Sequence, residues 1–205
     1  IVHRIDKDTS GLLVVAKTAR AHQSLSEQFK AHGTDGRLKR TYRALAWGVP
    51  DRRDGVIDAP LARSTSNRLK IAVARDGRHA VTHYKVLETF AGRDKPAVVS
   101  LIELQLETGR THQIRVHLAH SGHPILGDPL YGTGMRTRAA LLTPEAQDAL
   151  NALGRQALHA AGLSFIHPAS GRRLTFESNF PADIQGLADR LRGPEKSRPK
   201  AVRRK

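Results

Sequence analysis

The sequence opens with a polar segment that leads directly into an apolar one. Asp6 lies in the middle of the polar segment His3–Gly11, and the apolar run Leu12–Ala16 follows. A continuous run rich in Val and Leu predicts a core strand that is buried on both faces. A carboxylate at the end of such a strand is poorly hydrated, and its burial is unfavourable unless a cation or hydrogen bonds compensate it. Asp6 therefore needs a partner, whereas Asp8 fits a simple turn.

The charge of the chain indicates the kind of partner. The 205 residues include 34 Lys and Arg against 19 Asp and Glu, a net charge of +15. Such an excess is typical of proteins that bind nucleic acid or anionic membranes. No basic amphipathic helix with an aromatic apolar face stands out and no apolar stretch approaches the ~20 residues of a membrane span, so RNA or DNA is favoured and no membrane partner is expected. Aromatic residues make up only 4% of the chain, which suits one or two bases held specifically.

The length suits one substantial domain, and the absence of cysteine excludes disulfides and thiolate metal sites. We therefore expect a cytoplasmic protein. The first residue is Ile, and a motif rich in functional residues starts at His3, so the chain is expected to lack an upstream part. The basic stretch 193–205 predicts a disordered tail that attracts phosphates without regard to sequence.

Alternating and helical patterns predict an α+β fold with a mostly antiparallel sheet, because successive strands are joined by short links. The segment 51–67 is predicted to be a long connection with a short apolar piece near Val56. Thr143 and Pro144 are typical of a helix start. The predicted strands are 38–47, 69–73, 80–90, 97–106, 156–166 and 172–178, and the predicted helices are 19–32, 111–122, 144–153 and 181–191.

A second polar motif, Gly109–Gly122, follows the strand 97–106. Thr111 is predicted to cap its helix, and Arg115 then falls in the first turn, where the helix dipole disfavours a cation. An arginine in that position indicates an anionic partner. Asp6 requires a cation, so we expect the two side chains to pair. Removing one member of a buried ion pair costs about 3–5 kcal/mol, so a buried pair of this kind is tightly held.

The same motif is rich in histidine, which leaves a metal site open as an alternative. His117, His120 and His123 are spaced three apart, but nearby carboxylates are scarce before Asp128. Histidines that make ordinary hydrogen bonds or contact phosphate are favoured over zinc ligands. Asp128 itself is assigned to a turn.

These motifs, in this order, resemble those of the RluA family of pseudouridine synthases, and most closely its RluC/RluD type, which modifies large-subunit ribosomal RNA. The match covers nearly everything from residue 1 to about 191, and one departure is Ile5, where the family has Leu. The matching stretches are His3–Gly11, Arg40–Tyr42, Gly109–His117, His123-Pro124 with Gly127–Gly132, and Gln156–Ala160.

The resemblance implies a pseudouridine synthase catalytic fold over residues 1–192, with a central RNA-binding cleft, and an upstream S4-like domain that this chain lacks. It implies that Asp6 is the catalytic aspartate, that Tyr42 stacks on the target base, and that Arg115 pairs with Asp6 and keeps it ionised. Arg4 would enter the space left by the flipped nucleotide. Further RNA contacts are expected from His3, Arg40, Arg110, His112 and His117. No metal or other cofactor is expected, and the protein is expected to be a monomer.

The implied reaction breaks the N1–C1′ bond of uridine, rotates the base and rejoins it through C5. Asp6 acts either as a nucleophile or as a base that removes a sugar proton, and the residue types do not decide between these routes. Tyr42 would hold the uracil and could help to remove the C5 proton. The alternatives are a transfer RNA pseudouridine synthase, a non-catalytic RNA-binding module, and a metal nuclease that uses His112, His117 and His120.

Overall fold

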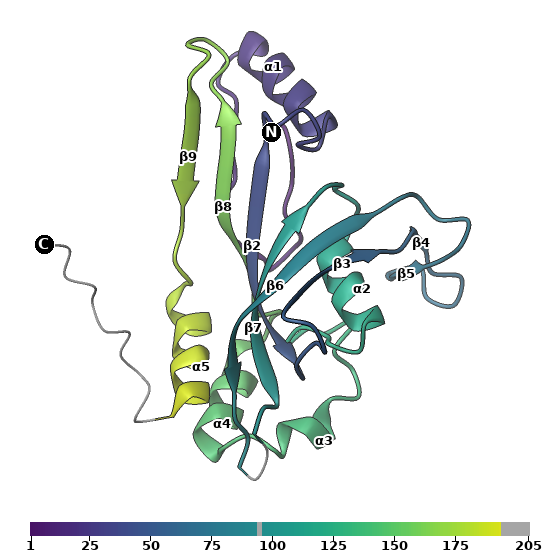
Figure 1. The fold of residues 1–205 in the computed structure, drawn as a ribbon, viewed down its shortest axis with the longest axis vertical. Coiled ribbons are helices and arrows are strands. Elements are labelled where there is room, and N and C mark those ends of the chain that lie inside the picture. Colours follow the sequence, from purple (N-terminus) through teal and green to yellow (C-terminus); the bar gives the residue numbers. More distant parts are fainter. Residues whose placement is uncertain (94–95, 194–205) are drawn as a thin grey trace, which may run out of the picture.

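A computed structural model describes residues 1–93 and 96–193 of the chain, and Figure 1 shows a long central sheet with helices packed around it. The strand order is β1-β8-β2-β7-β6-β3, and β9 pairs with β8. Every pairing in this sheet is antiparallel except that of β1 with β8. Its strands are β1 (Ser10–Gly11), β2 (Lys39–Trp47), β3 (Asp54–Asp58), β6 (Val81–Phe90), β7 (Val99–Leu106), β8 (Leu158–Ile166) and β9 (Arg173–Glu177).

Two short strands, β4 (Leu61–Arg63) and β5 (Ile71–Val73), form a separate antiparallel pair. We call residues 59–80, which contain this pair, the arm, and Figure 1 shows it projecting from the side of the molecule. Helix α1 lies at one end of the long sheet, and α4 and α5 lie together at the other. The helices are α1 (Ala19–Lys30), α2 (Gln113–His120), α3 (Arg136–Ala139), α4 (Pro144–Leu153) and α5 (Ala182–Arg192).

Three groups of buried apolar side chains hold these elements together. The largest fills the space between the sheet and helices α2, α4 and α5, and a smaller one, with Leu25 and Phe29 at its centre, fixes α1. The third, around Leu61 and Val116, joins the arm to α2. The arm therefore depends on the body of the protein, because a two-stranded sheet is marginal alone. The fully buried members of the largest group include Leu45, Ile102, Leu104, Leu118, Ile125, Leu126, Leu142, Ile184 and Leu187.

The α+β class and the mostly antiparallel sheet are confirmed. The predicted helix at 19–32 is α1, and its buried residues are Leu25, Gln28 and Phe29. The helix predicted at 144–153 is α4, with Thr143 accepting a hydrogen bond from the backbone N–H of Ala146 as its cap. The hairpin predicted near the end of the chain is β8 with β9.

The prediction of a fully buried strand at Leu12–Ala16 is wrong. Only Ser10 and Gly11 pair with β8, and Leu13 and Val15 are 44% and 57% exposed. The segment lies at the edge of the sheet, where Leu12 and Val14 pack under α1 while the alternate residues face outward. Gly11 is required at the pairing because its φ is +112° and a Cβ there would collide with the backbone of Ala160.

Two further expectations differ from the structure. The segment 51–67 contains β3 and β4, and is not one long connection. β4 has only three residues, and β3 alternates between exposed and half-buried positions, so the apolar pattern of both is weak. Thr111 does not cap α2. His112 occupies that position in the left-handed conformation, with φ +56°, and makes no side-chain cap.

The basic stretch predicted to be a disordered tail begins at Gly193 and otherwise lies outside the described residues. Within residues 1–93 and 96–193, no helix is both long and apolar enough to cross a membrane.

Candidate active site

A pocket of about 440 Å³ lies where the N-terminal segment, the end of α1, β2 and the start of α2 meet. This volume lies within the usual range of ligand pockets. Its apolar wall includes Ile5, Leu106 and Leu158, and four cationic side chains, Arg4, Lys30, Arg40 and Arg110, also line it. Asp6 is the one acid among the lining residues.

Asp6 is held at the pocket by a turn, and hydrogen bonds to β8 and to Gln156 fix the backbone of that turn. The N–H of Thr9 donates to the carbonyl of Asp6 at 3.1 Å, and Ser10 and Gly11 pair with β8. The buried amide of Gln156 donates to the carbonyl of Lys7 at 2.7 Å. The side chain of Asp6 is 23% exposed, so it is reachable from the pocket but poorly hydrated.

Arg115 lies between two carboxylates. Its Nε and Nη2 donate to Asp128 at 2.7 and 2.8 Å in a bidentate pair, and its Nη1 lies 3.8 Å from Oδ2 of Asp6. The structure therefore brings Arg115 beside Asp6, as expected, but the tighter partner is Asp128, a role that the sequence analysis does not assign. Asp128 also accepts hydrogen bonds from the backbone N–H groups of Leu130 and Tyr131. This arrangement fixes the guanidinium plane and directs Nη1 toward Asp6.

Burial disfavours the charged forms of Arg115 and Asp128, but the contact between the two side chains outweighs this effect of burial. Burial alone would raise the pKa of Asp128, but the hydrogen bonds from Arg115, Tyr131 and Leu130, with the charge of Arg115, lower that pKa below its ordinary value. Burial alone would lower the pKa of Arg115, but Asp128, with a smaller contribution from Asp6, raises it. Both groups are therefore charged at neutral pH.

Tyr42 lies on β2 and forms part of the pocket wall, although its side chain is mostly buried. Burial raises the pKa of its hydroxyl, and the negative charge of Asp6 raises it further, against the opposing effect of Arg40. Tyr42 is therefore an uncharged phenol at neutral pH, and the charge of Asp6 acts on its hydroxyl.

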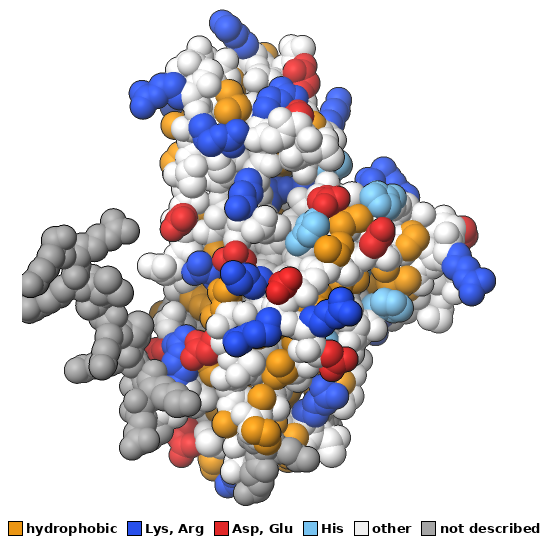
Figure 2. All heavy atoms as spheres, in the orientation of Figure 1, with side chains coloured by type: hydrophobic (Ala, Val, Ile, Leu, Met, Phe, Trp, Pro, Cys, Tyr) orange, Lys and Arg blue, Asp and Glu red, His pale blue; other side chains and the backbone are white. Residues whose placement is uncertain are grey.

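Two buried nitrogen atoms at the pocket have no hydrogen-bond partner among the described residues: Nδ1 of His32 and Nε of Arg40. Arg40 donates from Nη2 to the carbonyl of Thr108 at 3.2 Å, which leaves Nε without a partner. A buried guanidinium N–H without a partner is costly, and at a basic pocket such a donor can bind an anionic group. The face drawn in Figure 2, by contrast, shows Lys and Arg side chains spread among acidic ones.

His3 and Arg4 are neighbours in sequence but lie in different environments. The ring of His3 stacks on Phe29 with centroids 4.2 Å apart, and its Nε2 accepts a hydrogen bond from Val14 N–H. Burial, with a contribution from Arg40, lowers the pKa of His3 to about 4, so it is neutral at physiological pH and presents no charge to a phosphate. Arg4 is exposed and donates to Thr111 at 2.9 Å across the pocket mouth.

A buried hydrogen-bond network places the loop that carries Arg110. Oε1 of Gln113 accepts from the Thr108 hydroxyl at 2.7 Å and from Arg110 N–H at 3.0 Å. Its Nε2 donates to the carbonyl of Val81 and to the Thr82 hydroxyl. Gln113 lines the pocket and was missed by sequence reasoning, because two of its partners, Val81 and Thr82, lie on β6 far earlier in the chain.

The prediction that His117 contacts RNA is corrected by its burial. His117 has 0% exposure, and its ring nitrogens lie 2.9 Å from the Thr82 hydroxyl and 3.0 Å from the carbonyl of Ala59. It therefore continues the Gln113 network into the core. The same contacts remove it from the alternative metal site, and the described residues contain no group of three His, Cys, Asp or Glu side chains that could hold a metal ion. His112, which is half-buried, contacts Tyr131.

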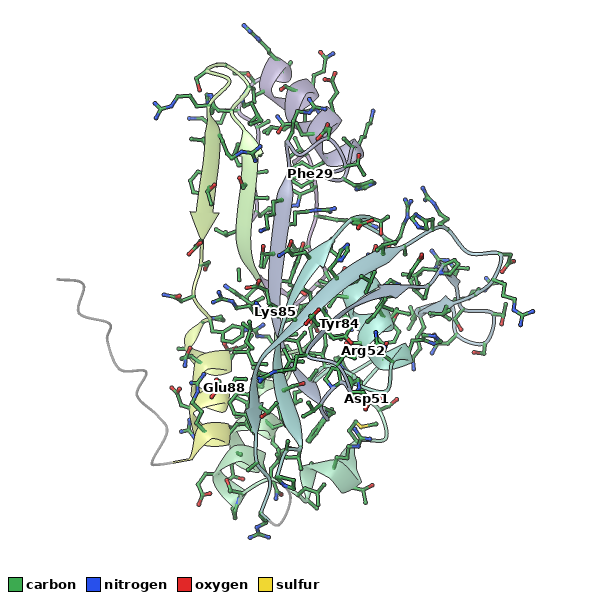
Figure 3. All side chains as sticks on the ribbon, viewed as in Figure 1. Phe29, Asp51, Arg52, Tyr84, Lys85 and Glu88 are labelled. Carbon is green, nitrogen blue, oxygen red and sulfur yellow. The ribbon has the colours of Figure 1, made fainter. Side chains whose placement is uncertain are left out.

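A second hollow of about 450 Å³ lies at the other end of α2. It is lined by Asp51 and Arg52 before β3, by Tyr84 on β6, by His120 at the end of α2 and by His123 after it. Figure 3 shows Asp51, Arg52 and Tyr84 around this region, well away from Phe29 at the first pocket. The Asp6 pocket, with one carboxylate among four cations and the buried Arg115–Asp128 pair beside it, is the better candidate for an active site.

Comparisons with known proteins identify the family of the chain. A family model described as RNA pseudouridylate synthase matches residues 1–120, which include Asp6, Tyr42 and Arg115. Human RNA Pseudouridylate Synthase Domain Containing 4 has a similar structure, with a TM-score of 0.70 and 28% identity, over 93% of this chain and 75% of that one. Human RNA Pseudouridylate Synthase Domain Containing 1 has a TM-score of 0.69 and 27% identity, over 88% and 68% of the two chains.

Curated relatives are more similar in sequence. Ribosomal large subunit pseudouridine synthase D of Zymomonas mobilis is 51% identical over 189 residues, which are 91% of this chain and 54% of that protein. The protein of the same name from Nitrosomonas europaea is 47% identical over 192 residues, which are 94% and 51% of the two. The chain spans about half the length of these relatives. The matching family model and the shared fold together show that the chain belongs to the RNA pseudouridylate synthase family.

Proposed function

We propose that this chain isomerises uridine to pseudouridine in RNA, with Asp6 as the catalytic carboxylate. The observation that carries the proposal is the position of Asp6: it is the one acid of a basic, partly apolar pocket, and a guanidinium held by a second carboxylate faces it at 3.8 Å. The pocket is large enough for a nucleoside that is flipped out of a helix or loop. The surrounding Arg and Lys side chains suit the flanking phosphates.

In this account Arg115 pairs with the Asp6 carboxylate, and Asp128 positions Arg115. Asp6 then acts either as a nucleophile or as a base on the sugar, and the geometry is compatible with both routes. Arg115 would also stabilise negative charge that develops on the substrate near Nη1. All three residues come from one chain, so the site needs no second copy, and we expect a monomer that acts in the cytoplasm.

Tyr42 is assigned to the detached uracil. Its ring forms part of the wall close to Asp6, and its raised pKa makes it a poor base at neutral pH. Stacking on the base and donation of a hydrogen bond therefore fit Tyr42 better than removal of the C5 proton, which the sequence left open. The Arg40 guanidinium, whose Nε has no hydrogen-bond partner among the described residues, is assigned to a phosphate beside the target nucleotide.

The names of the relatives support large-subunit ribosomal RNA as the substrate, with transfer RNA as the alternative. The test is to incubate the chain with transcripts of each and to map pseudouridine by carbodiimide labelling and primer extension. We expect discrete modified positions in the large-subunit transcript. Modification of transfer RNA alone would replace the proposed substrate, and modification of neither, with RNA binding retained, would favour a non-catalytic binding module.

A further inference from the structure

Tyr131 contacts three separate parts of the chain that surround the Asp6 site. Its hydroxyl accepts a hydrogen bond from the backbone N–H of Ile71 on β5, at 2.9 Å, and lies 2.9 Å from Nδ1 of His112 at the start of α2. Its ring lies 5.1 Å from the guanidinium carbon of Arg115. One side chain therefore links the arm, the motif that begins α2 and the ion pair that faces Asp6.

The donor and acceptor roles at Tyr131 determine the protonation of His112. A tyrosine hydroxyl has one proton to donate, and burial raises the pKa of Tyr131, so the proton is retained. The hydroxyl oxygen accepts from Ile71 N–H, and we assign its proton to Nδ1 of His112. Because burial lowers the pKa of His112, the ring is neutral and in this assignment carries its proton on Nε2.

Tyr131 also supports two residues that need support. His112 has a left-handed backbone, with φ +56°, which non-glycine residues adopt only where their surroundings hold them. Arg115 presents Nη1 to Asp6, and the Tyr131 ring lies against its guanidinium as a cation–π contact. Asp128 fixes both ends of this unit, because it binds Arg115 and accepts from the backbone N–H of Tyr131.

The arm reaches the site through the same side chain. Ile71 and Val73 of β5 pack with Tyr131 against Leu61 and Val116, and Nζ of Lys70 lies 5.9 Å from the centre of the Tyr131 ring. The hydrogen bond from Ile71 N–H is the polar part of this contact. A displacement of β5 would therefore break the hydrogen bond from Ile71 N–H to the Tyr131 hydroxyl. The hydroxyl would then be free to reorient, and its contact with His112 would no longer be fixed.

We propose that Tyr131 is a positioning residue that couples the docked arm to the Asp6 site, by holding His112 and Arg115 in place while β5 is bound to its hydroxyl. This inference rests on the proposed function and adds to it a dependence of catalysis on the position of the arm. RNA that contacts the arm would thereby affect the geometry around Asp6.

The test uses Tyr131→Phe, which keeps the ring and removes the hydroxyl, with Tyr84→Phe at the second hollow as the matched control. We expect Tyr131→Phe to lower the single-turnover rate by about tenfold, with RNA affinity within about twofold of wild type. We expect the Ile71 amide to exchange hydrogen at least about tenfold faster, and His112 to lose its Nε2–H preference in ¹⁵N spectra. Tyr84→Phe should change none of these.

Three results would overturn the coupling: a wild-type His112 protonated on Nδ1, an unchanged Ile71 exchange rate in Tyr131→Phe, or a rate loss fully matched by a loss of RNA affinity. The spectroscopic and exchange measurements need no turnover. An inactive wild-type chain would therefore count against the proposed function, while His112 and Ile71 would still decide whether Tyr131 couples the arm to the site.

Discussion

Arg115 is buried, yet it carries a charge that must be compensated and must also face Asp6. Its side chain is 4% exposed, an environment in which an unpaired guanidinium would be strongly unfavourable. Asp128 uses two of its nitrogens and offsets most of that penalty, which leaves Nη1 directed at Asp6. The site thus holds a cation beside the candidate catalytic carboxylate without relying on that carboxylate for stability.

Replacement of Asp128 tests this division of roles. We expect Asp128→Asn to lower the free energy of unfolding by about 3–5 kcal/mol, because it leaves Arg115 buried with no full countercharge. The control is Asp183→Asn, which breaks a bidentate pair with Arg155 in which Asp183 is 43% exposed, and which should cost about 1 kcal/mol. Urea denaturation of both variants gives the comparison, and equal losses would refute the central position of Asp128.

Sequence reasoning singled out Asp6 and Arg115 because each lies in a motif with an unusual feature: an acid before an apolar run, and a cation at a helix start. Tyr42 was predicted from the family resemblance. It missed Asp128 as the partner of Arg115. Asp128 is 13 residues from Arg115 and lies in a turn, and nothing in local spacing shows that the chain folds back there. His117 was misassigned because burial cannot be read from residue type.

At the scale of elements, α2 begins without a side-chain cap of its own. His112 at its N-cap makes none, and Gln113 instead binds the preceding loop and β6. The helix start, the loop that carries Arg110 and the sheet are therefore one hydrogen-bonded unit. This unit places one wall of the pocket.

Loss of the Gln113 amide should loosen that unit. Gln113→Leu leaves the Thr108 hydroxyl proton and the Arg110 N–H without their acceptor, and removes one of two donors from the Val81 carbonyl. We expect the free energy of unfolding to fall by about 2–4 kcal/mol. Gln185→Leu on α5, which loses one hydrogen bond to Asp189, should cost less than about 1 kcal/mol. Chemical denaturation measures both, and a Gln113→Leu protein as stable as Gln185→Leu would contradict the account.

Elements with strong local signals were predicted well and those defined by tertiary contact were not. Thr143 with Pro144 marked the start of α4 correctly. The apolar run Leu12–Ala16 was predicted to be a buried strand, but only one of its sides is covered, because α1 packs on that side and no strand pairs beyond Gly11. β3 was missed because its five residues alternate between exposed and half-buried positions.

The whole molecule should lose stability in mild acid. Burial is the main cause that lowers the pKa of His3, His32, His112, His117 and His159. Below the ordinary value of 6.5 the unfolded chain therefore binds protons that the folded protein does not, and stability falls as the pH falls toward about 4, the folded value for His3. The contribution of Asp128 is lost only below its ordinary value of 3.8, at lower pH.

We therefore expect the urea midpoint to be lower at about pH 5 than at about pH 7.5. His3→Gln should reduce this difference, with His79→Gln, at a histidine of the arm whose side chain is 67% exposed, as the control. A midpoint that is constant or rises in acid would contradict the inferred burial of neutral histidines.

The net charge of +15 should appear in the salt dependence of RNA binding. Each phosphate contact to single-stranded RNA adds about 0.7 to the steepness of log affinity against log salt. The stretch 193–205 contains six cations, Lys196, Arg198, Lys200, Arg203, Arg204 and Lys205, against the one acid Glu195, so its deletion should make the slope shallower. Equal slopes for the two proteins would exclude any phosphate contact from these residues.

The most direct test of the central claim is tritium release from C5-labelled uridine in large-subunit ribosomal RNA, measured under single-turnover conditions. Asp6→Asn should lower the rate by roughly a thousandfold or more, while RNA affinity changes little because backbone contacts dominate binding. Asp8→Asn is the matched control: Asp8 has φ +67°, which asparagine tolerates, and it should release tritium like wild type. Release by wild type and by Asp8→Asn but not by Asp6→Asn is the predicted result. Comparable release by Asp6→Asn would contradict the account.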